Sequence, residues 1–433
     1  MKRHTLYILL LVCILLLAGC GKQPDSCEQP TQDMVSEESD GLQLDADETV
    51  RLYQEIYDEV IESDAVNVEQ SPESIQRIVQ KLGEEGYVAI DCENQIDMTE
   101  KEQVLSFCES VDKKEEAELT IISVEAIYKF TIYSLSTANG KVEVSRECYQ
   151  YNNECFAVVS AASYAADSWQ YTEEGYLIFT GSSYSEESYV LTMSDVPETA
   201  AFRVEPLDEQ YRIYNRCYML PMGYRRNNMF LCDWSEEDYG KLDFYDVFDR
   251  FYPSIYQQSV PYVADVNINL GAVYQVPEEE FENVVTMHLA IDKETLQSKT
   301  KYLTEEKAYE YRPRGFHEAE YPNIPYPEVV GYDTNDDGTI TLTVNAVYPS
   351  EGTSKAFSHE VVIRPLDDDG FQYVSNTVFP SKDDYGTGWH TDRLTDAAWE
   401  EIYGDCLSLM HCIRMMRKQT TIKCNIMWRH GSQ

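Results

Sequence analysis

The stretch of sequence that decides the fold is Glu118–Tyr151, ELTIISVEAIYKFTIYSLSTANGKVEVSRECYQY. It is rich in Ile, Thr, Tyr, Phe and Val, the residues that suit the pleated, half-buried surface of a strand. Asn139-Gly140 separates its two β-rich runs, and an Asn-Gly pair in this setting is the strongest short-range signal of a β-hairpin. We therefore predict neighbouring antiparallel strands here.

Three helices are predicted before this hairpin. Apolar residues recur at spacings of three and four in Asp47–Val60, which indicates an amphipathic helix. Pro72 near its start and Gly83 at its end mark a second helix. Thr99 and Glu102 match the pattern of a capping box, so the third helix is predicted to follow them.

The rest of the chain repeats this order of helix and strands. Two groups of strands are predicted on either side of a helix over Pro277–Leu289: Ser168–Thr172, Tyr176–Thr180 and Tyr189–Met193, then Lys307–Arg312, Glu328–Tyr332, Thr339–Tyr348, Ala356–Arg364 and Phe371–Val378. Helices followed by antiparallel strands define the α+β class. The order of elements is similar to that of nuclear-transport-factor-like or cystatin-like rolls, so we expect two helix-plus-antiparallel-sheet domains.

The first residues indicate export. Lys2 and Arg3 precede an uncharged run, Leu6–Leu17, which has the length of the apolar core of a signal peptide. The run ends in Leu17-Ala18-Gly19-Cys20, which resembles the lipobox of bacterial lipoproteins. This resemblance implies cleavage after Gly19, lipidation of Cys20 and anchoring to the cell membrane, facing outside the cytoplasm. Two acyl chains suffice for lasting attachment.

Composition divides the exported chain into further segments. We expect a signal peptide at 1–19, an acidic disordered tether at 20–47, an N-terminal α+β domain at 48–205, a mixed junction at 206–260, a C-terminal α+β domain at 261–395 and a helical, basic, Cys-containing tail at 396–433. The tether has few large apolar residues and many acids, and like charges extend such a segment.

Several short runs resemble an uncharacterised lipoprotein family of Gram-positive anaerobic bacteria. They are Phe281–Val285 (FENVV), Glu328–Tyr332 (EVVGY), Asp337–Leu342 (DGTITL), His359–Arg364 (HEVVIR) and Phe371–Asn376 (FQYVSN). That family has no assigned activity, so the resemblance implies a lipid-anchored protein of the envelope and no catalytic residue.

The charge balance excludes one class of partner. Lys and Arg number 34 against 77 Asp and Glu, which gives a net charge of −43. Nucleic-acid binding needs a basic face that displaces counterions from phosphates, so we expect no nucleic-acid partner. Residues 406–433 contain five basic residues and no acid, a local reversal that indicates either a contact with anionic polymer or a divergent end.

One acidic loop has part of a calcium-binding pattern. Asp333, Asn335 and Asp337 stand at alternate positions before Gly338, as in the first part of an EF-hand loop. The twelfth position is Val344 rather than Glu, and the flanks are predicted strands. Asp-Gly is also a preferred hairpin turn, so calcium binding and a plain turn both remain open.

The cysteines allow local disulfides in an exported chain. Of 12 cysteines, Cys13 leaves with the signal peptide and Cys20 is the lipid site. The pairs that are close enough in sequence to bond are Cys92 with Cys108, Cys148 with Cys155, and Cys217 with Cys232. Disulfides are permitted outside the cytoplasm, and the alternative is that these thiols stay reduced.

The sequence carries no recognisable catalytic signature. It has no H-E-x-x-H, G-x-S-x-G, S-x-x-K pair or P-loop, which favours a non-catalytic binding or interaction role with an unknown protein or glycan partner. The chain holds 33 Tyr, and tyrosines suit both strands and the stacking of sugar rings. The alternatives are therefore a solute- or carbohydrate-binding lipoprotein and, with less support, a secreted hydrolase.

Overall fold

The structure is a computed structural model that describes residues 40–63, 72–152, 155–183, 197–264, 270–320, 323–367, 370–381 and 388–404, with side chains from residue 48 onward. The predictions for the signal peptide, for Cys20 and for residues 20–39 of the tether lie outside these residues. So do the strand predicted at Tyr189–Met193 and the basic tail beyond residue 404. The last part of the predicted disordered tether, residues 40–47, is instead the start of a helix, Asp40–Ser63.

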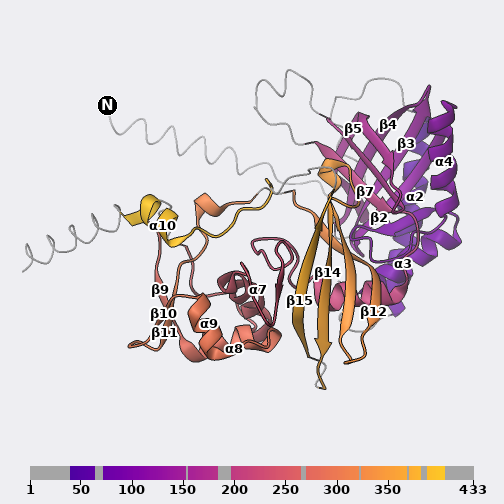
Figure 1. Ribbon diagram of the computed structural model, residues 1–433. Coiled ribbons are helices and arrows are strands. Elements are labelled where there is room, and N and C mark those ends of the chain that lie inside the picture. The colour runs from indigo at the N-terminus through magenta and orange to yellow at the C-terminus, as the bar shows by residue number, and fades with distance from the viewer. Residues whose placement is uncertain are drawn as a thin grey trace, which may run out of the picture.

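The first half of the chain forms a sheet of seven described strands in chain order, with three helices beside it (Figure 1). The helices are α2 (Asp40–Ser63), α3 (Pro72–Glu84) and α4 (Lys101–Lys113), and the strands are β1 (Val88–Asp91), β2 (Ala117–Ala126), β3 (Lys129–Ala138), β4 (Lys141–Asn152), β5 (Cys155–Tyr171), β6 (Tyr176–Gly181) and β7 (Glu198–Arg203). All neighbouring strands are antiparallel except β1 and β2, which run parallel.

The predicted hairpin is confirmed. Ala138 pairs with Lys141 across the turn, and both central residues have positive φ, 56° at Asn139 and 75° at Gly140. This backbone is that of a type I′ turn, whose twist matches that of the flanking strands.

Strand β2 is buried on both faces, because helices cover both sides of this part of the sheet. Ile121 packs with Val104 of α4, whereas its neighbour Ile122 packs with Tyr53 of α2 and Ile78 of α3. This arrangement explains why the neighbouring residues Ile121 and Ile122 are both fully buried, since alternate positions face different cores.

The capping box predicted for α4 is wrong. The hydroxyl of Thr99 accepts from the backbone N–H of Ala89 at 2.9 Å and donates to the carbonyl of Tyr87 at 2.8 Å. Its side chain therefore binds β1, and Glu100 occupies the position before α4 without a side-chain bond to the helix. The hydrogen bonds of Thr99 with the backbone around β1 therefore take the place of the predicted cap at the start of α4.

The second half contains two further sheets and most of the remaining helices. Its elements are α6 (Glu209–Tyr214), a π-helical turn (Asn215–Met219), β8 (Trp234–Ser235), α7 (Phe244–Tyr256), β9 (Tyr274–Pro277), α8 (Glu278–His288), α9 (Lys293–Lys299), β10 (Tyr302–Leu303), β11 (Ala308–Tyr311), β12 (Tyr326–Thr334), β13 (Ile340–Val347), β14 (Phe357–Pro365), β15 (Phe371–Pro380) and α10 (Asp396–Trp399). Short 3₁₀ turns lie at Phe316–Glu318 and Pro349–Glu351. The helix predicted at Pro277–Leu289 is confirmed, as are the five strands predicted after it.

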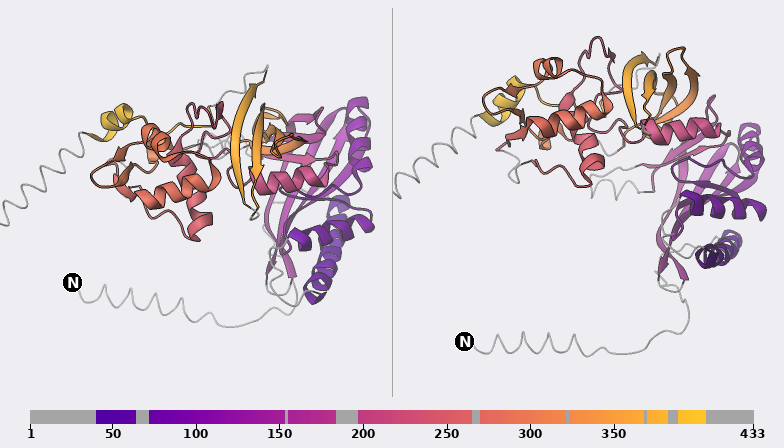
Figure 2. Two further views of the ribbon diagram at one scale, coloured as in Figure 1. Left: turned by 60° about the horizontal axis from the view of Figure 1, so that its bottom comes forward. Right: turned by 90° about the horizontal axis from the view of Figure 1, so that it is seen from below.

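The antiparallel sheet β12-β13-β14-β15-β8 stands between the first sheet and the helices α7 to α9, as all three views show (Figures 1 and 2). A separate three-stranded sheet, β10-β11-β9, lies beyond those helices. The α+β class predicted from the sequence is therefore confirmed for the described residues.

The stretch that we expected to be a junction, 206–260, belongs to the core of the second unit. Phe230, Phe244 and Phe248 are buried in the same cluster as Leu342 of β13 and Val361 of β14. The second unit thus begins near residue 209, and its core is more aromatic than that of the first.

The two units meet through buried polar groups. The hydroxyl of Tyr176 on β6 donates to Oε1 of Glu328 on β12 at 2.6 Å, and Arg203 on β7 lies 3.3 Å from the other carboxylate oxygen. Asn94 covers the free edge of β7 by accepting from the backbone N–H of Arg203 and donating to the carbonyl of Ala201. Burial raises the pKa of Glu328.

Candidate functional site

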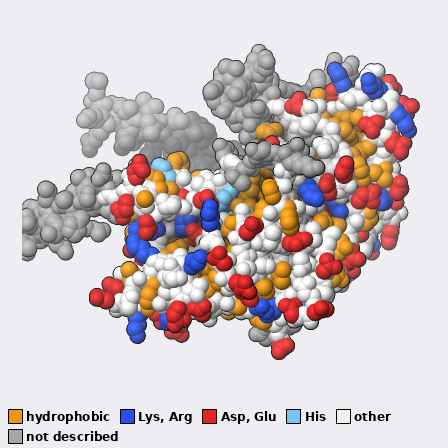
Figure 3. Space-filling model, viewed as in Figure 1, with side chains coloured by type: hydrophobic (Ala, Val, Ile, Leu, Met, Phe, Trp, Pro, Cys, Tyr) orange, Lys and Arg blue, Asp and Glu red, His pale blue; other side chains and the backbone are white. Residues whose placement is uncertain are grey.

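A pocket of about 370 Å³ opens in the second unit, between the three-stranded sheet and the last described segment. Its walls come from Tyr245 on α7, the 298–301 turn, Glu310 and Arg312 on β11, Glu318, and residues of the 393–399 segment. Figure 3 shows several Lys and Arg side chains gathered on this side of the molecule, among scattered Asp and Glu side chains.

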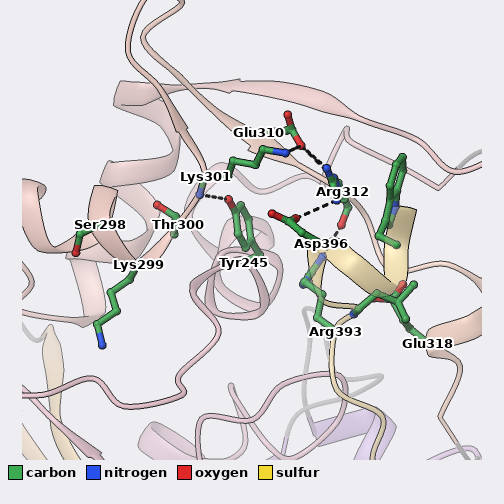
Figure 4. A pocket seen from close by; sticks show the side chains of 12 residues that line it. Tyr245, Ser298, Lys299, Thr300, Lys301, Glu310, Arg312, Glu318, Arg393 and Asp396 are labelled. Atoms are coloured by element: carbon green, nitrogen blue, oxygen red, sulfur yellow. Dashed lines mark hydrogen bonds and ion pairs between the residues drawn. The ribbon is translucent and has the colours of Figure 1, made fainter. Parts of the chain in front are cut away.

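Ion pairs hold one wall of the pocket in a fixed order (Figure 4). Oε1 of Glu310 accepts from Nζ of Lys301 at 2.6 Å and from Nε of Arg312 at 3.0 Å. Nη1 of Arg312 donates onward to Oδ1 of Asp396 at 3.0 Å. Charged groups on the 298–301 turn, on β11 and on α10 are thus joined in one row.

Aromatic rings support this row from the side. The guanidinium of Arg312 lies 4.2 Å from the ring centre of Trp399, a cation–π contact that helps to hold the guanidinium in place. Gly271 backs the same ring, since a Cβ there would come within 2.8 Å of both Trp399 and Tyr403. The hydroxyl of Tyr245 accepts from the backbone N–H of Lys301 at 2.9 Å.

Beneath the pocket lies a buried cluster of acids and arginines. Asp243 precedes α7, and Asp246 and Asp249 follow it at helical spacing, so all three carboxylates share one face. Arg393 donates to Asp246 at 2.8 Å and to Asp249 at 2.7 Å. Arg314 donates to both oxygens of Asp246, at 2.9 and 2.7 Å. The cluster therefore fixes the segment that carries Arg393.

Three carboxylates face two guanidiniums in this cluster, and the imbalance affects protonation. Burial, followed by the charge of Asp246, raises the pKa of Asp243 to about 6. Burial also raises the pKa of Tyr245 to about 12, so its hydroxyl keeps its proton at neutral pH. The pocket can consequently offer a neutral phenol donor beside its charged groups.

The residues predicted to bind calcium lie elsewhere, on the hairpin between β12 and β13. Oδ1 of Asp337 accepts from the N–H and the hydroxyl of Thr339, and Nδ2 of Asn335 donates to the hydroxyls of Thr339 and Thr341. Asp333 is exposed on β12. No group of three or more His, Cys, Asp or Glu in the described residues could hold a metal ion, and the calcium prediction stays a prediction.

The three local disulfides that we predicted are not formed. Cys92, Cys108, Cys148, Cys217 and Cys232 are free thiols. Cys155 is disulfide-bonded, to a partner outside the described residues. Cys148 pairs with Ser160 on β5, whereas Cys155 pairs with Asn152, so the two cysteines sit about four residues, or ~13 Å, apart along the ladder. A disulfide needs Cα atoms within about 7 Å.

Sequence reasoning did not find the residues of this pocket. Lys301, Glu310 and Arg312 are charged residues in a chain that has many, and nothing in the sequence around them marks a site. Asp396 was predicted only as the first residue of a helical tail. The one local signal was the helical spacing of Asp243, Asp246 and Asp249.

These features define an α+β protein with two sheet-based units, a buried polar interface between them and a charged pocket in the second. A model of a family of unknown function, DUF6070, matches residues 39–393, and the chain belongs to this family. No curated protein and no solved structure matches the chain. In the part of the chain that the structure describes, no helix is long and apolar enough to cross a membrane.

Proposed function

We propose that this chain is a lipid-anchored protein of the cell envelope that binds a small polar ligand and does not catalyse a reaction. The observation that carries the binding role is the pocket of about 370 Å³ with its preformed row of ion pairs. Most ligand sites are largely preformed cavities in which a few placed polar groups orient the ligand. Groups that are already ordered lose little entropy on binding.

The sequence supports the anchor. Leu17-Ala18-Gly19-Cys20 closes an apolar run, and the acidic segment between Cys20 and the start of α2 at Asp40 would hold the folded part away from the envelope surface. Membership of a lipoprotein family of Gram-positive anaerobes is part of the same proposal. The net charge of −43 supports partners other than nucleic acid. Nuclear-transport-factor-like or cystatin-like rolls remain our proposal for the two units.

Metabolic labelling tests the anchor. Cells that express the full chain are grown with labelled palmitate, and the chain is recovered from the membrane fraction. We expect label on the wild-type chain and none on Cys20→Ala. Equal labelling of both, or an unlabelled wild-type chain, would contradict the anchor.

Thermal unfolding tests the binding role. The full chain is heated with single compounds from a library of amino acids, peptides, sugars and organic acids, because a ligand of the folded state raises Tm. We expect at least one compound to raise Tm for the wild type and not for Lys301→Ala. Turnover of a glycan or peptide that a single carboxylate substitution abolishes would contradict the non-catalytic role.

A further inference from the structure

We infer that the pocket binds a small zwitterion, a ligand with one ammonium and one carboxylate such as a free amino acid or a dipeptide. The inference rests on the proposed binding function and names the class of ligand. It is carried by three properties of the walls: their charge balance, the positions of their unused donors and acceptors, and the covering of their aromatic rings.

The lining carries four cations and three carboxylates, so charges of both signs are present in nearly equal number. The charge of Arg393 is balanced by two carboxylates outside the pocket lining, since Arg393 donates to Asp246 and Asp249 in the cluster beneath the pocket. The other charged residues of the lining are three cations and three carboxylates: Lys299, Lys301, Arg312, Glu310, Glu318 and Asp396. A ligand with one charge of each sign keeps this balance. It also avoids the repulsion that a net anion meets from a chain of charge −43.

Unused donors lie together at one end of the row. Lys301 directs its Nζ to Oε1 of Glu310, which occupies one of the three ammonium hydrogens. The hydroxyl of Tyr245 accepts from the backbone of the same lysine, and its own proton has no acceptor among the described residues. The lysine ammonium and the phenol therefore form a place for a carboxylate (Figure 4).

Unused acceptors lie further along the same row. Glu310 makes its contacts with Lys301 and Arg312 through Oε1, and its Oε2 bonds no described residue. Asp396 uses Oδ1 for Arg312, and its side chain is 73% exposed. These two carboxylates can accept from an ammonium while they keep their existing ion pairs. The donor and acceptor ends lie on one wall, as the two ends of a zwitterion require.

The aromatic rings of the pocket argue against a stacked sugar. Trp399 has the guanidinium of Arg312 over its ring at 4.2 Å and Gly271 packed against it. The ring of Tyr245 is contacted by Phe281 at 5.4 Å and by Arg393 at 5.7 Å. Sugar rings need an open aromatic face, whereas a zwitterion needs only the polar edge of this wall.

Calorimetric titration of the full mature chain in detergent micelles tests the inference. The probes are L-alanyl-L-alanine, its C-terminal amide, its N-acetyl form, acetate and glucose. Loss of one charged hydrogen-bond partner costs a ligand about tenfold or more in affinity. We expect the free dipeptide to bind, and the amide and the N-acetyl form to bind at least about tenfold more weakly. Acetate and glucose should bind as weakly as the blocked dipeptides or not at all.

Variants locate the binding event. Lys301→Ala should lower the affinity for the free dipeptide by about tenfold or more. Lys293→Ala, which removes the same charge from α9 but lies outside the pocket and pairs with Glu278, should leave its affinity unchanged. The comparison of blocked and free dipeptides uses the wild-type chain, so it holds even if a variant does not fold.

The other outcomes separate the two proposals. Equal binding of free and blocked dipeptides, or no binding of the free dipeptide, would overturn the zwitterion inference. If acetate or glucose bound instead and Lys301→Ala abolished that binding, the inference would fail and the binding function would stand. If no compound of the thermal-unfolding library bound either, both would fail.

Discussion

Arg393 donates from Nη2 to Oδ1 of Asp246 at 2.8 Å across 147 residues of sequence, and the two side chains are only 8% and 1% exposed. Burial alone would lower the pKa of Arg393, but Asp246, Asp243 and Asp249 together raise it well above its usual range. The guanidinium is therefore always charged. It ties the end of the described chain to α7, directly under the pocket.

Removal of this arginine should destabilise the protein strongly. Arg393→Met leaves the buried Asp246 and the half-buried Asp249 with one counter-charge fewer, and breaking a buried pair from one side costs about 3–5 kcal/mol. Urea unfolding should show this loss in the free energy of unfolding. Arg364→Met is the matched control, because the Arg364–Glu236 pair is 36% and 24% exposed and should contribute at most about 1 kcal/mol. Equal losses for the two variants would contradict the prediction.

The interface between the two units should depend on a single hydroxyl. Tyr176→Phe removes the 2.6 Å bond to Glu328 and leaves a buried carboxylate with one partner fewer, which should cost about 1–3 kcal/mol. The measurement is urea unfolding of the full chain. Tyr171→Phe removes a longer, exposed bond to Glu205 at 3.3 Å and should change stability by less than about 0.5 kcal/mol.

A double-mutant cycle would show whether the bond itself is responsible. If the hydroxyl acts through Glu328, Tyr176→Phe should cost much less when Glu328→Leu is already present, because leucine has no acceptor for the hydroxyl. The same cost in both backgrounds would assign the effect to the other contact of the hydroxyl, with the hydroxyl of Tyr326 at 3.5 Å, instead.

The parts of the fold that were predictable are those set by neighbours in sequence. The hairpin at Asn139-Gly140 is set by a two-residue turn, and that of β12 with β13 by alternating runs on either side of Asp337-Gly338. The parallel pairing of β1 with β2 was missed because it joins Val88 to Ile121 across α4. The hydrogen bonds of Thr99 were mispredicted for a similar reason, since its hydroxyl accepts from the backbone of Ala89 on β1 and does not cap α4.

The site was much less predictable than the fold. An ion pair such as that of Lys301 with Glu310 depends on which strands meet, and nothing in the charge of either residue marks it. Arg312 and Asp396 are 84 residues apart and meet in a segment that Arg393 also ties to β11, by donating to the carbonyl of Arg312. With 77 acids in the chain, the place of a carboxylate in the tertiary structure rather than its residue type distinguishes the relevant ones.

The free cysteines should differ sharply in reactivity. Cys217 is exposed, whereas Cys148 is buried in the sheet with its thiol directed to Glu125 at 3.7 Å. A brief treatment of the native chain with iodoacetamide should modify Cys217 and spare Cys148, as peptide mass spectrometry would show. Treatment in urea should modify both. Modification of Cys148 at the rate of Cys217 in the native chain would contradict its burial in β4.

A buried histidine should make stability depend on pH. Nδ1 of His359 lies 2.7 Å from the amide oxygen of Asn376, and the hydroxyl of Tyr224 lies 2.9 Å from Nε2. The amide nitrogen of Asn376 donates to the carbonyl of Cys232, which fixes the orientation of the amide. Nδ1 therefore carries the hydrogen and Nε2 accepts, so the ring is neutral. Burial lowers the pKa of His359 to about 4.

Since an unfolded histidine has a pKa of about 6.5, the unfolded chain takes up this proton first as the pH falls. The stabilising contribution of the neutral ring is complete above about pH 6.5 and declines toward pH 4, by about 3 kcal/mol in all. Asp243 acts in the opposite direction, because its raised pKa of about 6 makes the folded chain take up a proton first. The curve of the wild type alone therefore mixes two effects of opposite sign.

Comparison with His359→Gln separates them. The variant keeps Asp243 and loses the titrating ring, so the difference in the free energy of unfolding between wild type and variant reports His359 alone. Urea unfolding at pH 7, 6, 5 and 4 should show the advantage of the wild type shrinking by about 3 kcal/mol as the pH falls. Parallel curves for the two proteins would mean that the imidazole takes up its proton equally in both states, which a ring bonded between Tyr224 and Asn376 in the core does not permit.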